Sequence, residues 1–133
     1  MIGLDSWIFL EYFVAGPKYK KCKELVLSRA TKIISVAVLM EIKYKGTKIA
    51  GKIKVKRFLN DIKINPSVRI VDVDTEIAER AATIRLNYYR KGKRELSYSD
   101  CIHLATAIVS KCKKFYSGDP DFKGINEMPI EVV

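Results

Sequence analysis

The sequence predicts an α/β fold, a three-layer α/β/α sandwich in which helices cover both faces of a mainly parallel central sheet. Short apolar runs of β type alternate along the chain with stretches of helical periodicity, which is the pattern of repeated strand–helix–strand units. At 133 residues, 48% of them hydrophobic, the chain is long enough to bury one core. It contains no repeat or long linker, so we expect one domain spanning residues 1–133.

The elements of the first half follow from apolar runs and the residues that end them. Gly16 and Pro17 stop the first helix, and Cys22, Leu25 and Val26 form the inward side of the second. Ser35 is placed to cap a third helix, which we expect Gly46 to end at Lys45. The expected elements are a strand at 1–5, helices at 6–14 and 18–28, a strand at 32–35, and a helix from 35 to 45.

The second half repeats the alternation. Ile49, Ile53, Leu59 and Ile62 recur at helical spacing before Pro66 closes the segment. The segment at 98–111 is apolar on nearly every side, so we expect that helix to be deeply packed. The expected elements are helices at 48–62, 75–91 and 98–111, the second ending at Gly92, and strands at 68–73, 114–117 and 129–133.

Four acidic residues lie beside hydrophobic elements, where a carboxylate is costly. They are Asp5, Glu41, Asp100 and Asp119. A lone ionised carboxylate in apolar surroundings costs several kcal/mol unless it is paired or binds a cation. Asp5 and Asp119 follow predicted strands, at the edge where parallel sheets carry their sites. We therefore predict that the four share a hard divalent cation, Mg²⁺ or Mn²⁺.

Each of the four acids also has an ordinary structural explanation. These are a helix N-cap for Asp5, an ion pair with Lys45 for Glu41, a capping box with Ser97 for Asp100, and a cap or turn before Pro120 for Asp119. Taken together, these explanations do not account for acids at the ends of two different strands. They also leave unexplained why Glu41 follows a run of apolar and small residues.

The net charge of +10 favours a polyanionic partner, nucleic acid before membrane, although a well-charged soluble surface is the simpler alternative. Residues 42–60 hold seven basic residues and no acid, and residues 85–94 hold five and no acid. Tyr88 and Tyr89 lie in the second block, where they either stack on bases or pack on the core. The predicted nucleic-acid-binding residues, for RNA if the resemblance described below holds, are Lys52, Lys54, Lys56, Arg90 and Lys91.

The sequence predicts a cytoplasmic protein with no membrane segment. It contains no basic leader before an apolar run and no uncharged apolar stretch of membrane-spanning length. Its three cysteines lack Cys-x-x-Cys spacing and are expected to be reduced core residues.

Five segments, in order, resemble the PIN domain, the fold of the VapC toxins. Asp5-Ser6 follows the first strand, and Glu41 ends the run Ile34-Ser-Val-Ala-Val-Leu-Met-Glu41. Asp100-Cys-Ile-His-Leu-Ala-Thr-Ala resembles the helix that carries the third acid of that family. Ser117-Gly-Asp119-Pro-Asp121-Phe resembles its last acidic turn, and Ile130-Glu-Val its closing strand.

The resemblance implies a Mg²⁺- or Mn²⁺-dependent ribonuclease whose catalytic acids are Asp5, Glu41, Asp100 and Asp119. In the same comparison Ser6 and Ser117 would orient a carboxylate or the metal-bound water, and Asp121 would be either a further ligand or a support for Asp119. His103, one turn after Asp100, is a less favoured candidate for the metal site. A phosphoacceptor receiver domain and a haloacid-dehalogenase-type phosphatase both need a second acid beside Asp5, which this chain lacks.

The resemblance also implies partners. A VapC-like toxin would be covered by a small antitoxin, for which the helices at 6–14 and 18–28 are candidate groove walls. Homodimerisation is expected by analogy with the family. The alternatives are a nuclease of RNA maturation and a PIN-like domain that binds RNA or a protein partner without cleaving.

Overall fold

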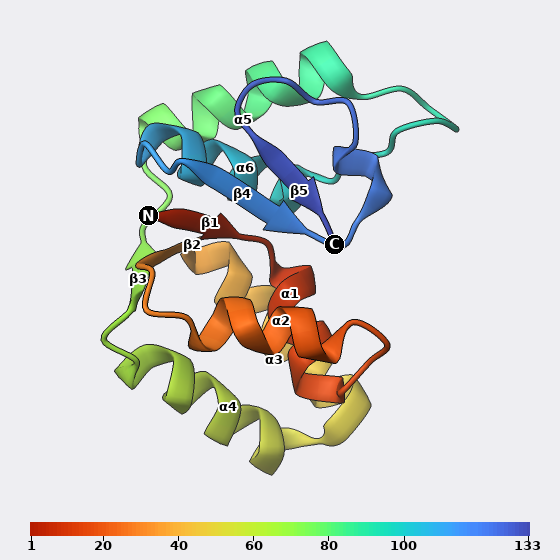
Figure 1. The fold of residues 1–133 in the computed structure, drawn as a ribbon. Coiled ribbons are helices and arrows are strands. Elements are labelled where there is room, and N and C mark those ends of the chain that lie inside the picture. Colours follow the sequence, from red (N-terminus) through yellow and green to blue (C-terminus); the bar gives the residue numbers. More distant parts are fainter.

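The computed structural model describes residues 1–133 and shows a five-stranded sheet between two layers of helices (Figure 1). The strands run in the order β3-β2-β1-β4-β5, and every neighbouring pair is parallel. Their bounds are β1 Ile2–Leu4, β2 Lys32–Ser35, β3 Val68–Val71, β4 Lys114–Ser117 and β5 Ile130–Val132. The predicted α/β/α sandwich with a mainly parallel sheet is confirmed, and the sheet is entirely parallel.

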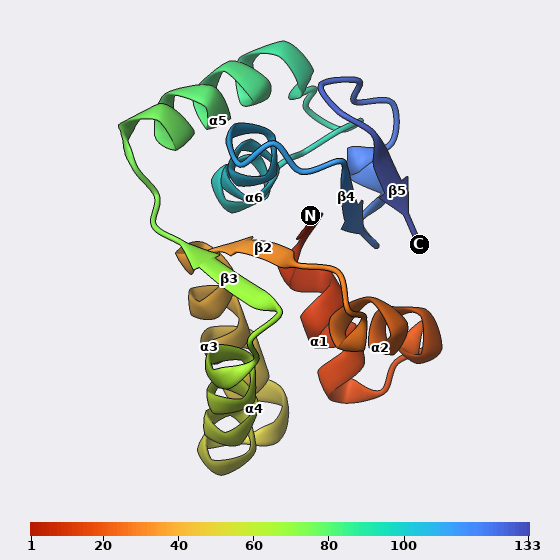
Figure 2. The same ribbon diagram turned by 60° about the vertical axis from the view of Figure 1, so that its left-hand side comes forward.

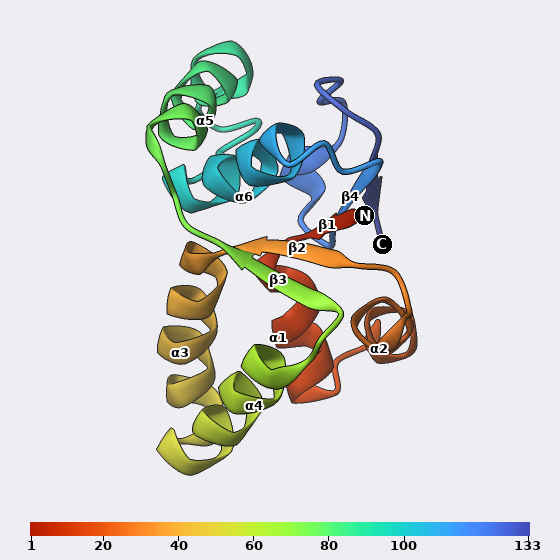
Figure 3. The ribbon, with the colours of Figure 1, turned by 90° about the vertical axis from the view of Figure 1, so that its left-hand side faces the viewer.

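Six α-helices and one 3₁₀ turn connect the strands. Helices α1 to α4 cover one face of the sheet, and α5 and α6 cover the other (Figure 3). The helices are α1 Ser6–Val14, α2 Tyr19–Leu27, α3 Val36–Ala50, α4 Lys52–Ile64, α5 Thr75–Tyr88 and α6 Tyr98–Val109, and the turn η1 is Pro120–Phe122. Figure 2 shows α3 and α4 packed together as a hairpin below the sheet.

Alternating side chains of the strands divide the core into two clusters. Ile2, Leu4 and Ile34 pack with α1 to α4, whereas Ile33 and Phe115 pack with α5 and α6. This division follows from the two-residue period of a strand, which sends neighbouring side chains to opposite faces. Both faces of the sheet are therefore buried, as a parallel sheet requires.

The register of β1 and β4 sets the position of the site. Leu4 pairs with Tyr116, so both strands end at the same edge of the sheet. The backbone N–H of Asp5 donates a hydrogen bond to the carbonyl of Tyr116 at 3.0 Å. Asp5 and the turn after Ser117 consequently lie side by side, although they are far apart in the sequence.

The α3 helix does not end at Lys45, as the glycine that follows it suggested. It continues through Gly46 to Ala50, and the break before α4 falls at Gly51, whose φ is +88°. Gly46 is buried because α4 packs against it: a Cβ at this position would lie 2.6 Å from Cγ2 of Val55. Gly46 therefore allows α3 and α4 to pack closely. Gly51, and not Gly46, has the positive φ that glycine adopts more readily than other residues.

Two further expectations need correction. The helix expected at 75–91 ends at Tyr88, and an antiparallel bridge between Arg90 and Arg94 replaces its last turn. Ile49 and Ile53, which fitted the helical period, are 62% and 72% exposed, because the chain breaks between them at Gly51.

The three cysteines are all buried and unpaired, in accordance with the prediction of reduced core thiols. Burial raises the pKa of Cys22 and of Cys101 to about 11, so both stay as neutral thiols at ordinary pH. None of the helices is both long enough and apolar enough to cross a bilayer.

Candidate active site

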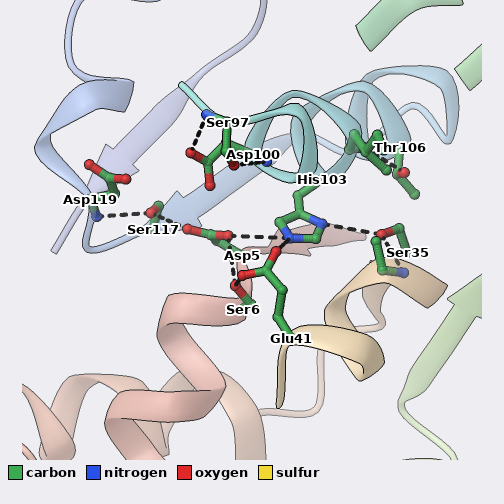
Figure 4. A network of polar contacts seen from close by, with 12 residues as sticks. Asp5, Ser6, Ser35, Glu41, Ser97, Asp100, His103, Thr106, Ser117 and Asp119 are labelled. Atoms are coloured by element: carbon green, nitrogen blue, oxygen red, sulfur yellow. Dashed lines mark hydrogen bonds and ion pairs between the residues drawn. The ribbon is translucent and has the colours of Figure 1, made fainter. Parts of the chain in front are cut away.

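The four predicted catalytic acids meet at one pocket of about 180 Å³ at the carboxyl edge of the sheet (Figure 4). Asp5 follows β1, Glu41 lies on α3, Asp100 on the first turn of α6, and Asp119 follows β4. All four line this pocket, together with Ser6 and Lys45. The fold thus brings into one place four carboxylates that are scattered through the sequence.

Asp5 stands at the N-cap position of α1, yet its carboxylate makes no capping hydrogen bond. The side chain turns into the site instead, where the hydroxyl of Ser117 donates to its Oδ2 at 2.6 Å. Only 2% of Asp5 is exposed, and burial raises its pKa to about 6 despite the opposing influence of His103 and Ser117. Capping, the ordinary explanation for this residue, does not account for its position.

Glu41 has both carboxylate oxygens occupied. Its Oε1 lies 2.6 Å from Nε2 of His103, and its Oε2 accepts a hydrogen bond of 2.8 Å from the Ser6 hydroxyl. The expected pair with Lys45 is also present, at 3.4 Å. Burial alone would raise the pKa of Glu41, but the hydrogen bonds from His103 and Ser6 and the charge of Lys45 lower it to about 2. This carboxylate is therefore ionised throughout the physiological range.

His103 links Glu41 to the start of α3. Its side chain is buried on α6, and its Nδ1 lies 3.2 Å from the hydroxyl of Ser35. The Ser35 oxygen accepts the N–H of Ala37 as the α3 N-cap, so its own proton is free to point at Nδ1. With that arrangement Nε2 carries the hydrogen donated to Glu41. Sequence reasoning gave His103 little weight, and its one signal was its place one turn after Asp100.

Asp100 and Asp119 each use one oxygen in a local structural role. Oδ2 of Asp100 accepts the N–H of Ser97, which completes a capping box at the start of α6. Oδ1 of Asp119 accepts the N–H of Asp121. The other oxygen of each makes no hydrogen bond within the chain. Burial raises the pKa of Asp100, and the neighbouring charge of Asp119 raises it further.

Asp121 lies outside the pocket, and Ser117 lies beneath it. Asp121 does not line the pocket, and its Oδ2 accepts a hydrogen bond from the N–H of Glu95 at 3.3 Å. Ser117 is buried beneath the site, where it donates to Asp5 and accepts the N–H of Asp119 at 2.9 Å. Of the two aspartates in this turn, Asp119 is the one at the pocket.

The free oxygens of the site agree in kind with a hard cation. Asp5, Asp100 and Asp119 each keep one carboxylate oxygen without a strong donor, since the Ser6 hydroxyl gives its single proton to Glu41 and lies 3.4 Å from Asp5. Oxygen ligands of this type suit Mg²⁺ and Mn²⁺. No three acidic, histidine or cysteine side chains are yet close enough to enclose an ion, so binding would require the carboxylates to draw together.

The predicted RNA-binding residues are distributed over two surfaces. Lys52 and Lys56 line a groove of about 570 Å³ between α3 and α4, together with Lys43 and Lys63. Lys54 is exposed but lies outside that groove. Arg90 and Lys91 are exposed in the loop between α5 and α6, in the opposite helical layer (Figure 1). The five residues therefore do not form one continuous patch.

An apolar hollow lies where sequence analysis expected groove walls for a partner. Phe9 and Tyr12 of α1, Val26 and Leu27 of α2, and Phe58 of α4 line it. Its volume is about 280 Å³. Phe9 is itself fully buried, whereas Leu27 is 56% exposed, so the hollow has both core and surface character.

Comparison with known proteins gives a family and a fold. A family model described as PIN domain matches residues 2–128. No curated protein shows significant sequence similarity to the chain. Among solved structures, the sarcin-ricin loop cleaving toxin VapC20 of Mycobacterium tuberculosis superimposes with a TM-score of 0.77 at 22% identity. That alignment covers 97% of this chain and 99% of the toxin.

Two complexes show the same fold. VapBC2 from Rickettsia felis, bound to a DNA fragment from its promoter, aligns with a TM-score of 0.73 at 22% identity, covering 98% of both chains. A toxin–antitoxin complex from Klebsiella pneumoniae aligns with a TM-score of 0.69 at 23% identity, covering 96% of this chain and 93% of that one. At these identities the similarity establishes the shared fold.

Proposed function

Because this chain belongs to the PIN-domain family, we propose that it is a metal-dependent ribonuclease and the toxin of a toxin–antitoxin pair. One observation carries the proposal: the carboxylates of Asp5, Glu41, Asp100 and Asp119 all line one pocket. The only basic side chains within 4 Å of these carboxylates are His103 and Lys45. Such an excess of negative charge favours a cation.

Asp5, Asp100 and Asp119 would hold Mg²⁺ or Mn²⁺ through their free oxygens. Such an ion, when bound there, would supply an activated water and a counter-charge for the phosphodiester transition state. Ser117 fixes Asp5 by its short hydrogen bond, and the capping box fixes Asp100 at the start of α6. These contacts limit the rotamers of Asp5 and Asp100, so the carboxylates would need to draw together only a little further, with Asp119 closing on the ion from the turn after β4.

Glu41 plays a different part in this proposal. With its pKa lowered to about 2 and both oxygens hydrogen-bonded, it stays charged and fixed in orientation. It would accept a hydrogen bond from a water or another outer ligand of the ion and orient that group, through lone pairs that these two contacts leave free. His103 and Ser6 hold it in place, and neither needs to touch the substrate.

The partner proposed for this toxin is a small antitoxin. The similar structures include toxin–antitoxin complexes, and the apolar hollow between α1, α2 and α4 suits the apolar side of an amphipathic helix. The chain is proposed to form a homodimer as well, by analogy with the family. A cytoplasmic location fits a toxin of this kind.

The test is RNA cleavage by purified protein with and without chelator. Wild-type protein should cut single-stranded RNA in Mn²⁺ or Mg²⁺, and chelator should stop it. Asp100→Asn should abolish turnover while keeping the capping box largely intact, because an amide oxygen can still accept the Ser97 N–H. Asp121→Asn is the matched control, and it should cleave normally because this residue does not line the pocket.

The two alternative functions predict other outcomes. A non-catalytic RNA-binding domain would bind RNA but leave it uncut in every metal. A maturation nuclease would cleave in vitro but would not arrest growth when expressed without a partner. Turnover by Asp100→Asn equal to wild type would remove that residue from the mechanism.

A further inference from the structure

Three stacked side chains form a platform where the end of α5 meets the start of α6. Cζ of Arg85 lies 4.4 Å from the ring centroid of Tyr89 and 4.3 Å from that of Tyr98. The Nε of Arg85 donates a hydrogen bond to the carbonyl of Leu96 at 3.0 Å, which holds the guanidinium in place. One ring comes from the end of α5 and the other from the start of α6, so the stack joins two elements into a fixed surface.

The platform exposes large apolar side chains that would ordinarily be buried. Tyr98 is 74% exposed and Leu86 beside it is 80% exposed. With Ala82, Arg85 and Tyr89 they line a surface hollow of about 430 Å³. Exposed aromatic side chains held rigidly by a neighbour are typical of binding surfaces.

Charge indicates what kind of partner fits. Residues 85–94 carry Arg85, Arg90, Lys91, Lys93 and Arg94 and no acidic residue. A second copy of this face would bring like charges together, which disfavours self-association through it. A single-stranded nucleic acid offers both features that the surface needs, namely phosphates for the cations and flat unpaired bases for the rings.

The platform and the acid pocket each take a side chain from the first turn of α6. Tyr98 precedes Asp100 by two residues on α6, which separates them by about 3 Å along the helix axis and about 200° around it. The ring and the carboxylate thus leave the first turn of α6 on different sides. A strand with a phosphate at the acid pocket would pass the start of α6 and reach Tyr98 with a neighbouring nucleotide.

We propose that Tyr98, supported by Arg85 and Tyr89, stacks on an unpaired base of a single-stranded nucleic acid whose backbone enters the acid pocket. This inference rests on the proposed nuclease function and adds a subsite to it. Of the sequence-predicted stacking residues, Tyr89 belongs to the platform and Tyr88 does not. The Tyr88 hydroxyl donates to Asn126, and its ring packs beside Arg94.

The test measures binding without turnover. A short fluorescein-labelled single-stranded RNA of mixed sequence is titrated in chelator and followed by fluorescence anisotropy. Tyr98→Ala should weaken binding about tenfold, since that is the scale of one base–aromatic stack. Tyr98→Phe should bind within about twofold of wild type because it keeps the ring. Ile64→Ala, which removes an equally exposed apolar side chain (77%) on α4, outside the hollow, is the matched control and should bind as wild type does.

Two results would overturn the platform. One is equal affinity of Tyr98→Ala and wild type for the single strand. The other is an equal loss of affinity for the same RNA annealed into a duplex, whose bases are not free to stack. Light scattering on the same samples adds a third: a change from dimer to monomer in Tyr98→Ala with unchanged affinity would make this face a contact between copies. If wild-type protein cleaves RNA but one of these results is found, the stacking proposal fails and the nuclease proposal stands. If Tyr98→Ala weakens binding but wild-type protein does not cleave RNA, the nuclease proposal fails and base stacking stands.

Discussion

The imidazole of His103 lies 2.6 Å from Oε1 of Glu41, and this contact joins the two helical layers across the edge of the sheet. Glu41 belongs to α3 on one face and His103 to α6 on the other. The Ser35 hydroxyl on the far side of the ring fixes its orientation. The position of the acid on α3 therefore depends on a residue of the helix that carries Asp100.

His103→Ala should lower kcat for the proposed cleavage about 10- to 100-fold, the usual cost of removing a group that orients a site carboxylate. His103→Gln should recover part of the loss, because its amide can still donate to Glu41. The measurement is steady-state cleavage with a thermal melt of each variant. Thr106→Val is the control on the same helix, since the Thr106 hydroxyl bonds only the Ile102 carbonyl. Equal kcat for His103→Ala and wild type would show that Glu41 needs no such support.

Asp5→Asn should stabilise the metal-free protein at pH 7.5, by an amount on the order of 2–3 kcal/mol. Burial raises the Asp5 pKa to about 6 from 3.8, so between these two pH values the folded chain holds a proton that the unfolded chain has released. Native stability consequently falls as pH rises from about 4 to about 6 and stays low above that. Asparagine carries no charge, so the gain should vanish at pH 4. Urea unfolding in chelator at both pH values measures it, and a destabilised variant at pH 7.5 would contradict the burial argument.

Mn²⁺ should raise the melting temperature of the wild-type protein, because an ion that binds only the folded state stabilises it by about 2.7 kcal/mol at a hundred times its Kd. Asp119→Asn should lose most of this shift and Asp121→Asn should keep it. The difference follows from their positions, since Asp119 lines the pocket and Asp121 accepts the Glu95 N–H outside it. Equal shifts in melting temperature for the two variants would contradict the assignment of Asp119, and not Asp121, as a ligand of the ion.

The sequence predicted the layers, the parallel sheet and the convergence of the acids because these depend on short-range patterns. Strand and helix periods, and the rule that parallel strands open their sites at one edge, place Asp5 and Asp119 without knowledge of packing. The Ser97–Asp100 capping box and the Glu41–Lys45 pair could also be predicted, because each joins residues three or four positions apart in one helix or at its start. In the structure, the capping box uses Oδ2 of Asp100 and leaves Oδ1 without a hydrogen bond.

What the sequence did not predict depends on contacts between distant segments. The Glu41–His103 contact spans 62 residues, and no local pattern specifies it. Gly46 looked like a helix end because a glycine is ambiguous until its neighbours are known, and only the approach of Val55 reveals its role. The split of the basic residues between two surfaces likewise follows from the layers, since α4 covers one face of the sheet and Arg90 and Lys91 follow α5 on the other. Within α4, the helical period places Lys52 and Lys56 on one side and Lys54 on another.

Replacing Lys52 and Lys56 together by alanine should raise KM for RNA more than it lowers kcat. The salt dependence of binding should also flatten, by about one unit of slope for each RNA phosphate that the variant no longer neutralises. Both lysines line the groove between α3 and α4, whereas Lys54 does not, so Lys54→Ala is a control of equal charge change per residue. The measurement is RNA affinity over a series of salt concentrations. A Lys54→Ala effect per charge as large as that of the pair would indicate that only net charge matters.

Gly46→Ala should destabilise the fold by about 1–2 kcal/mol, although alanine is the better helix former. The added Cβ would lie 2.6 Å from Cγ2 of Val55 and 3.4 Å from the Phe13 ring, so α4 would have to shift. In a Val55→Ala background the obstructing methyl groups are gone, and Gly46→Ala should then become neutral or stabilising. Urea unfolding of the two single variants and the double variant gives the coupling energy directly. Because α3 also carries Glu41, a shift that widens the α3–α4 hairpin should lower cleavage by Gly46→Ala, and Val55→Ala should restore it. Additive free energies would show that the two side chains do not meet.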